Sequence, residues 1–322
     1  MLLLARMRFK RAISIGGGDL SLGEGFTGIL HSDTIFSGIA NKLAEIPSNY
    51  DGGYSIKELI SNLNTDSPPF RISSAFPYFM DEYYLPTPYG TGELYLEKLK
   101  DVPLIKLSDF LELASGNYER IKKKPLKDSV NELMVSFTAP RVTIDRITTS
   151  TNIYQTTGWL MNQDCGLYFL IDLKDELLKD KLLLCIRLLG ESGIGGDRSI
   201  GYGIFDSELI EIDNLPEWSE LFQERGGKNT SYYSLSLCYP SNNDEAKEAI
   251  SYNILSRKGW IFSSSSIKQS KRRECKMFAE GSLFKSPIKG QMAKVAPSRF
   301  RQEEHEVYRY GLGMMVEIVN HY

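Results

Sequence analysis

A glycine-rich segment limits the folds open to this chain more than any other feature, because five glycines lie within the eleven residues 193–203. Residues 175–190 precede it and predict an amphipathic helix, and residues 197–212 predict a strand. A Rossmann loop is excluded, since that loop runs from strand to helix and Arg198 stands where the third glycine of GxGxxG belongs. A P-loop is excluded because no Gly-Lys-Ser/Thr ending follows. Amides without a neighbouring Cβ atom approach a phosphate or another main chain closely, and an ordinary helix-to-strand turn is the simpler alternative.

Charge is unevenly distributed along the chain. The 38 Lys and Arg against 41 Asp and Glu give a net charge of −3, which argues against generic electrostatic coating of nucleic acid. Residues 257–309 nevertheless carry 13 basic and five acidic side chains, a net of +8, whereas residues 206–225 carry seven acids and one arginine. We interpret the basic segment as a phosphate-binding surface, with a solvated lysine-rich face as the alternative.

Cysteines and histidines are few and far apart, so no zinc-site spacing is present and we expect neither metal nor cofactor. Unpaired cysteines of this kind predict a reducing, cytoplasmic location. No run of about 18 apolar residues predicts a membrane span. The residues concerned are Cys165, Cys185, Cys238 and Cys275, with His31, His305 and His321.

The order of predicted elements favours an α+β protein with two ferredoxin-like (RRM-like) domains. Residues 5–212 read β-α-β-α-ββ-α-β, with the first strand expected over 5–15 and a short helix over 107–115, which is typical of one elaborated ferredoxin-like domain. The first helix follows His31, with Ser32 or Asp33 as its predicted N-cap. After Pro216 the strand pattern restarts, so we expect an N-terminal domain over 1–215 and a smaller C-terminal domain over 216–322. Residues 47–69 and 122–127 match no pattern.

Several short motifs, in a fixed order, carry a resemblance to a known family. Beside the helix and glycine loop they are Leu30–Phe36 (LHSDTIF), Ile72–Tyr78 (ISSAFPY) with Leu85–Pro88 (LPTP), Asp197–Gly203 (DRSIGYG), and Phe278–Phe284 (FAEGSLF) with Tyr308–Gly313 (YRYGLG). The chain thereby resembles, from about residue 5 to 318, the crRNA 5′-tag-capping subunit of type III-A (Csm) CRISPR effector complexes, within the RAMP superfamily.

The resemblance implies a fold and a role. It implies two RRM-like domains and a β-hairpin thumb at about 134–168, whose long strands we expect to be joined by a polar segment at Thr143–Thr157. It implies a non-catalytic subunit that holds the repeat-derived 5′ tag of crRNA in antiviral defence. Its expected protein partners are the large polymerase/cyclase-type subunit and the first backbone RAMP subunit, with target RNA met only indirectly.

The candidate RNA-binding residues supply cations, hydroxyls, amides and a wedge, as recognition of a kinked single strand requires. A helix N-terminus offers amides to an anion, the basic segment offers lysines and arginines, and Ile144 or Ile147 of the thumb could separate bases. A plain edge hairpin is the alternative for the thumb. The residues are His31, Ser32, Thr34, Arg141, Thr143, Ile144, Arg146, Gly195, Gly196, Arg198, Gly201, Lys268, Lys271, Arg272, Arg273, Lys285 and Lys289.

Two other functions are compatible with the sequence. A relative within the superfamily, the repeat-cleaving endoribonuclease, can use a histidine as general acid or base, which would give His31 that role. Against it, the sequence shows no obvious partner for His31, and adjacent residues of His-Ser-Asp project in different directions. The other alternative is a purely structural assembly subunit, in which the acidic segment 206–225 would dock a protein.

Overall fold

A seven-stranded antiparallel sheet forms the larger half of the molecule, in the order β5-β4-β3-β8-β1-β9, with β2 paired to β8. The computed structural model describes residues 1–15, 28–47, 55–90, 99, 102–123, 130–226, 230–261, 270–298 and 306–319. The strands are β1 (Leu2–Phe9), β2 (Phe70–Ile72), β3 (Phe76–Phe79), β4 (Glu82–Pro86), β5 (Leu104–Lys106), β8 (Cys165–Leu173) and β9 (Phe205–Glu211).

Helices cover both faces of this sheet. The helices α1 (Ser32–Glu45) and α7 (Lys179–Ser192) lie side by side on one face, with α2 (Ile56–Leu63) next to α1. Ile35 and Ile39 of α1 pack there against Leu3 and Met7 of β1, because alternate residues of a strand face opposite sides. The opposite face carries α4 (Leu107–Ala114) and α8 (Pro216–Leu221), with α5 (Tyr118–Lys123) and α6 (Val130–Leu133) nearby.

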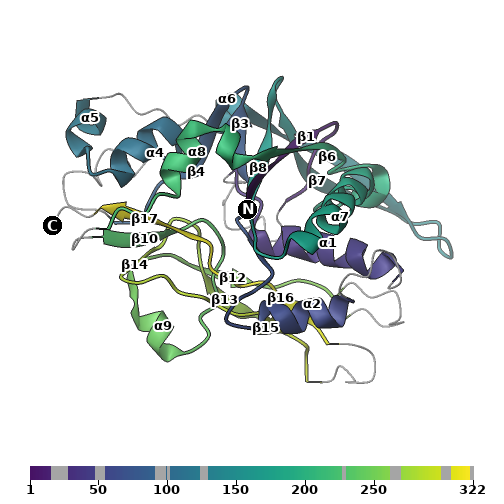
Figure 1. The fold of residues 1–322 in the computed structure, drawn as a ribbon. Coiled ribbons are helices and arrows are strands. Elements are labelled where there is room, and N and C mark those ends of the chain that lie inside the picture. Colours follow the sequence, from purple (N-terminus) through teal and green to yellow (C-terminus); the bar gives the residue numbers. More distant parts are fainter. Residues whose placement is uncertain are drawn as a thin grey trace.

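The second half of the chain forms a smaller sheet in the order β11-β14-β10-β17, all antiparallel, drawn below the first sheet in Figure 1. Two further strand pairs, β12 with β13 and β15 with β16, lie beside it. The elements are β10 (Thr230–Ser234), α9 (Asn243–Lys247), β11 (Ala249–Ser251), β12 (Ile254–Arg257), β13 (Cys275–Phe278), β14 (Leu283–Phe284), β15 (Ala293–Lys294), β16 (Tyr308–Arg309) and β17 (Met315–Val319).

The two halves share their hydrophobic cores. Tyr310 packs with Phe36 of α1, their ring centroids 4.9 Å apart, and its hydroxyl accepts a hydrogen bond from the Ile72 amide. On the other side, Tyr233 lies in one cluster with Trp218 of α8, and its hydroxyl donates to the Pro86 carbonyl. Because apolar burial dominates folding energetics, the halves are expected to stabilise one another.

A two-stranded hairpin of β6 (Met134–Ile144) and β7 (Thr151–Met161) leaves the first sheet and extends past α7 (Figure 1). Its base is fastened by two backbone hydrogen bonds between Ile13 and Trp159, both 2.9 Å. Beyond that base, most residues of the hairpin are exposed.

The structure corrects several expected element boundaries. The connection expected over Thr143–Thr157 is confined to residues 145–150. The rest of that segment belongs to β6 and β7, because threonines and a tyrosine suit an exposed two-stranded ribbon. The first strand ends at Phe9 rather than near residue 15, and the strand expected from 197 begins at Phe205. Helix α1 is capped by His31 without a side-chain hydrogen bond, so the predicted caps Ser32 and Asp33 are helical residues engaged elsewhere.

Helix α2 was missed in residues 47–69, although Ser55 and Glu58 form a capping box there that the sequence pattern could have revealed. None of the helices in the described part of the chain combines the length and apolar character that a membrane span requires. The four cysteines are unpaired, and all but Cys275 are buried.

Candidate nucleic-acid interface

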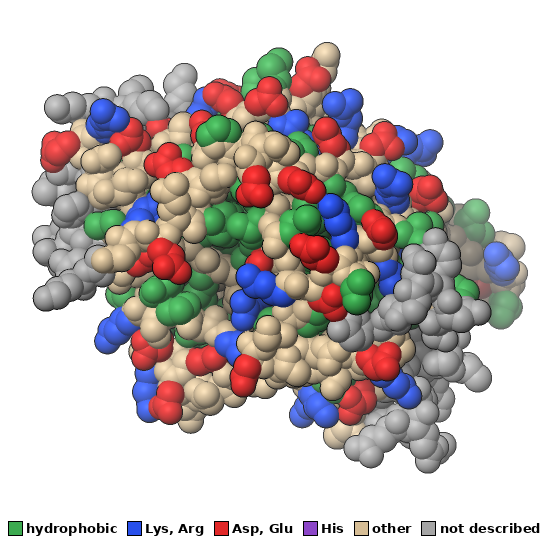
Figure 2. Space-filling model, in the orientation of Figure 1, with side chains coloured by type: hydrophobic (Ala, Val, Ile, Leu, Met, Phe, Trp, Pro, Cys, Tyr) green, Lys and Arg blue, Asp and Glu red, His purple; other side chains and the backbone are tan. Residues whose placement is uncertain are grey.

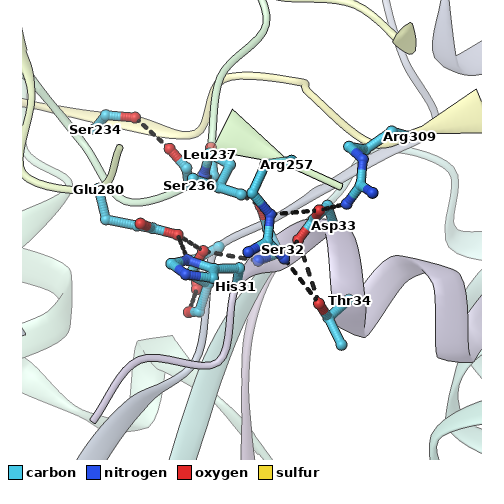
Figure 3. Close-up of polar contacts among 12 residues, drawn as sticks. His31, Ser32, Asp33, Thr34, Ser234, Ser236, Leu237, Arg257, Glu280 and Arg309 are labelled. Carbon is cyan, nitrogen blue, oxygen red and sulfur yellow. Dashed lines mark hydrogen bonds and ion pairs between the residues drawn. The ribbon is translucent and has the colours of Figure 1, made fainter. Parts of the chain in front are cut away.

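The start of α1 meets the second half of the chain through a buried acid, Glu280. The Nδ1 atom of His31 lies 2.9 Å from Glu280 Oε1, and the hydroxyl of Ser74 donates to the same oxygen (Figure 3). Burial alone would raise the pKa of Glu280, but His31 and these hydrogen bonds outweigh burial and lower that pKa. The carboxylate is therefore held ionised at the contact between the two halves.

A second buried acid, Asp33, lies in the first turn of α1. Arg257 binds it in a bidentate manner, with Nε 3.0 Å from Oδ2 and a terminal nitrogen 2.9 Å from Oδ1, and Arg309 donates to Oδ2 as well (Figure 3). The side chain of Asp33 is 0% exposed and that of Arg309 is 5% exposed. Burial would raise the pKa of Asp33, yet the two arginines hold it well below its ordinary value.

Ser32 and Thr34 complete this contact. The Ser32 hydroxyl accepts from the Leu237 amide at 3.2 Å, and the Ser32 amide donates to Ser74 Oγ at 2.8 Å. The Thr34 hydroxyl donates to Asp33 and accepts from Arg257. We call residues 31–34 with Ser74, Arg257, Glu280 and Arg309 the inter-sheet joint. Three candidate RNA-binding residues, His31, Ser32 and Thr34, therefore belong to the joint and contact other parts of the protein.

Sequence reasoning missed Arg257, Glu280 and Arg309 as partners of the α1 start. Arg257 and Arg309 lie 224 and 276 residues from Asp33 in the chain, and Glu280 lies 249 residues from His31. No spacing rule connects positions so far apart. The motifs that contain Glu280 and Arg309 were nevertheless marked by the family resemblance, which was the one signal available.

The glycine loop packs against main chain, one of the two uses expected for it. The Gly196 amide donates to the Ser14 carbonyl at 2.8 Å, and the Gly203 amide donates to the Ala12 carbonyl at 2.8 Å. Gly203 has φ +72°, and a Cβ atom there would lie 1.9 Å from the Ile194 carbonyl oxygen. Side chains are therefore excluded by close backbone approach. Gly195 touches the same Ser14 carbonyl.

The outer part of this loop is open to solvent. A short 3-10 turn at Arg198–Ile200 is exposed and ends at Gly201, which has φ +88°. Tyr202 follows and receives Arg141 from the hairpin, whose terminal nitrogen donates to the tyrosine hydroxyl at 3.3 Å. The guanidinium carbon of Arg141 lies 5.8 Å from the centroid of that ring. The loop and the base of the hairpin therefore form one surface.

The hairpin has two different faces. Val142 pairs across the strands with Ile153, and Ile144 lies on the same face, where it is 62% exposed. Arg141 pairs with Tyr154 on the opposite face, which it shares with Thr143. A base wedge at Ile144 and a phosphate contact at Arg141 would therefore address opposite sides of the ribbon. The turn beyond them places Arg146 and Ile147 in solvent, and Ile147 is 93% exposed.

The basic segment 257–309 is not one continuous patch. Besides the two arginines of the joint, four of its cations pair with carboxylates or backbone: Lys258 with Glu274, Lys289 with Asp66, Lys294 with Glu306, and Arg273 with the Lys294 carbonyl. Figure 2 shows acidic and basic side chains interspersed over the face in view. Lys285 is exposed, and Lys268 lies outside the described residues.

Two predicted residues of this segment, Lys271 and Arg272, lie at the end of the β12–β13 hairpin. The Nζ atom of Lys271 is 5.2 Å from the ring centroid of Trp260, which is 57% exposed and was not predicted as a site residue. Arg272 is half-buried beside the joint, and its backbone amide donates to the Gly259 carbonyl at 2.8 Å.

The described residues contain no cluster of three His, Cys, Asp or Glu side chains that could hold a metal ion. His305 and His321 lie outside the described part of the chain.

Two antiparallel sheets with helices, together with a glycine loop that packs on the end of the first strand, define a mixed α/β protein of RAMP-like fold. Comparison with known proteins is more specific. Residues 227–318 match the CRISPR Csm4 C-terminal domain. The Csm4 protein of Thermococcus onnurineus is 29% identical over 301 residues, which cover 89% of this chain and 91% of that protein.

Solved structures agree in fold. A chain of the Csm3–Csm4 subcomplex of the type III-A CRISPR-Cas interference complex aligns with a TM-score of 0.65 at 19% identity, covering 98% of both chains. A chain of a Csm1–Csm4 cassette in complex with cA4 aligns with a TM-score of 0.61 at 19% identity, covering 100% of this chain and 99% of that one. The predicted resemblance to the type III-A Csm subunit is confirmed, and that subunit is Csm4.

Proposed function

We propose that this chain is a non-catalytic, cytoplasmic subunit of a type III-A CRISPR interference complex. It links the large polymerase/cyclase-type subunit, Csm1, to the backbone RAMP subunit, Csm3, and it holds the 5′ tag of crRNA in antiviral defence. The observation that carries this proposal is similarity along nearly the whole chain, in sequence to Csm4 proteins and in fold to chains of both the Csm1–Csm4 and the Csm3–Csm4 assemblies. Unpaired cysteines support the reducing compartment.

We further propose that the two halves are ferredoxin-like domains, 1–215 and 216–322, and that the β6–β7 hairpin is the thumb. The first sheet uses strands up to Glu211, and the second begins at Thr230, which supports a boundary between them. An isolated pair of strands is only marginally stable in water, so a ribbon that extends beyond its sheet is a natural contact element for a partner or a nucleic acid.

The proposed RNA contacts are the predicted residues that the structure leaves accessible. Most of them group at the glycine loop with the hairpin and at the end of the β12–β13 hairpin, and Lys285 follows β14. Recognition of single-stranded RNA uses cations for phosphates and exposed aromatic rings for bases, and both regions offer the cations. These residues are Arg141, Thr143, Ile144, Arg146, Arg198, Gly201, Lys271, Arg272, Arg273 and Lys285.

The experiment that tests this proposal is reconstitution with and without RNA. The full chain is co-expressed with Csm1 and Csm3 and with a CRISPR array, and crosslinks from each crRNA nucleotide are mapped to the subunits. We expect the chain to copurify with both proteins and to crosslink to the tag nucleotides. Copurification without any tag crosslink would favour the purely structural subunit, and tag crosslinks on another polypeptide would contradict the proposal.

The endoribonuclease alternative draws on one observation, the buried carboxylate of Glu280 beside His31, since a carboxylate that orients a histidine is a common arrangement for a general base. We assign this contact to the joint, because Glu280 also binds Ser74 and both acids of the joint connect the two halves. Incubation of the chain with repeat RNA in EDTA distinguishes an endoribonuclease from a structural role of this contact. Site-specific cleavage that is lost in H31A would establish the enzyme.

A further inference from the structure

Positive charge exceeds negative charge at one buried place outside the proposed contacts of the glycine loop. Arg257, Arg309 and Arg272 gather around Asp33, which forms hydrogen bonds with the first two. Burial and then the neighbouring Arg309 lower the pKa of Arg272, while Asp33 offsets this only in part. The other nearby carboxylate, Glu280, is held by His31 and Ser74. Among the described residues, Asp33 is therefore the one carboxylate that accepts hydrogen bonds from these three guanidinium groups, through Arg257 and Arg309.

Donors in this cluster are left without acceptors. The Nε atoms of Arg272 and Arg309 are buried and have no hydrogen-bond partner within the described part of the chain. A buried donor without a partner costs about 1–3 kcal/mol, and more when the group is charged. The cluster is not sealed from solvent, because the Arg257 side chain is 22% exposed and Arg272 is half-buried. An anion could therefore reach these arginines.

The neighbouring end of the β12–β13 hairpin carries an aromatic platform. Trp260 forms an isolated antiparallel β-bridge with Lys271, and the Arg272 amide donates to the carbonyl of Gly259. The indole ring and Arg272 of the cluster therefore belong to adjacent positions of one ribbon. Gly259 has φ +141°, a conformation that L side chains rarely adopt. The backbone thereby changes direction between Arg257 and the tryptophan. An exposed tryptophan next to cations is typical of surfaces that stack nucleic-acid bases.

We propose that Arg257, Arg272 and Arg309 bind a backbone phosphate of single-stranded RNA, and that Trp260 stacks on a base of the same strand. A phosphate supplies the acceptors and the negative charge that one aspartate cannot supply alone. Asp33 keeps two of the guanidinium groups oriented before the ligand arrives. The assignment of RNA as the ligand rests on the proposed function, because an acidic peptide would meet the arginines equally well but would make no use of the indole ring.

The test measures binding of the full chain to a fluorescein-labelled single-stranded RNA of crRNA tag sequence by anisotropy at several salt concentrations. W260A is expected to weaken binding by about five- to a hundredfold, the range for loss of one stacked base, without changing the salt dependence. W260F should retain most of the affinity. R272Q is expected to weaken binding and to reduce the salt slope by about 0.7, the value for one phosphate contact on a single strand.

The control is K247A, which removes an exposed cation on α9 that pairs with Asp244 of the same helix. It should bind like the wild type. Circular dichroism checks that each variant folds. If R272Q does not fold, the binding measurement on W260A still tests the site. Wild-type affinity and salt slope in both variants would overturn the site while leaving the proposed function intact. Displacement by polyglutamate but not by RNA would also overturn it. Absence of crosslinks between the crRNA tag and this chain in the assembled wild-type complex would instead contradict the proposed function.

Discussion

The start of α1 within the inter-sheet joint and the β6–β7 hairpin were both expected to contact RNA, yet they are built on opposite principles. The joint is buried, and each of its two acids is paired with residues from the other half of the chain. The hairpin is exposed and is held mainly by its own cross-strand pairs, with its base fastened at Ile13. A polar motif therefore does not reveal by itself whether it serves the fold or a partner. Burial distinguishes the two, because a buried charge must be paired within the protein.

The largest expected effect comes from breaking the joint at Asp33. D33N removes the carboxylate that Arg257 and Arg309 share, and leaving such buried cations unpaired costs about 3–5 kcal/mol. Urea unfolding of the full chain measures the loss. The matched control D244N removes an exposed acid on α9 and is expected to change the free energy of unfolding by less than about 0.5 kcal/mol. A loss at Asp33 no larger than this would show that the joint does not hold the halves together.

Lowering the pH should remove the stability that the ion pairs of Asp33 contribute. Because the folded-state pKa of Asp33 lies below the ordinary value of 3.8, its ion pairs stabilise the fold fully above pH 3.8, and the contribution is lost as pH falls below it. The difference in unfolding free energy between the wild type and D33N is therefore expected to be constant near neutral pH and to shrink below pH 3.8. A difference that does not change down to the lowest pH at which the chain folds would contradict this assignment.

The contact of His31 with Glu280 should have a smaller effect. H31A leaves the buried carboxylate with Ser74 as its remaining side-chain donor, which is expected to cost about 1.5–3 kcal/mol. A double-mutant cycle of H31A with E280Q measures the coupling, which we expect to exceed about 1 kcal/mol. The exposed pair of Lys247 and Asp244 on α9 provides the reference cycle, where about 0.3–0.5 kcal/mol is expected. Equal coupling in the two cycles would contradict a buried, structural contact.

The smallest effect on stability is expected in the hairpin. I144A should change the free energy of unfolding by less than about 0.5 kcal/mol, because the side chain is 62% exposed. The same substitution at buried Ile39 of α1 should cost about 2–5 kcal/mol. Copurification of I144A with Csm1, Csm3 and crRNA then reports the role of the hairpin. A stability loss above about 1 kcal/mol at Ile144 would mean that the hairpin belongs to the fold.

Local pattern predicted much of the architecture. Helices α1, α4 and α7, the paired strands after residue 134 and the restart of strands after Pro216 all follow from periodicity and turn residues. Short strands such as β4 and β5 were missed, since a few apolar residues do not separate strand from loop. The connection expected over Thr143–Thr157 was too long, because only residues 145–150 join the strands and the polar residues of the exposed ribbon on either side resemble a loop.

The candidate site was only partly within reach of the sequence. The arginines and lysines of the basic segment were recognised as a group, but the structure divides them between interior and surface. Arg257 and Arg309 turn inward to Asp33, Lys289 pairs with Asp66, and Lys271 lies over Trp260 in solvent. Charge counting is blind to this division, because it records neither direction nor burial.

The sequence by itself determined the local elements, the position of the glycine-rich loop, and the resemblance to the type III-A subunit, since these depend on residues within a few positions of one another or on motifs in order. Tertiary structure alone decided that a helix start at residue 31 meets an acid and two arginines more than 200 residues away. The physical reason is that the strength of an ion pair depends on distance and burial, and both arise only when the two halves pack.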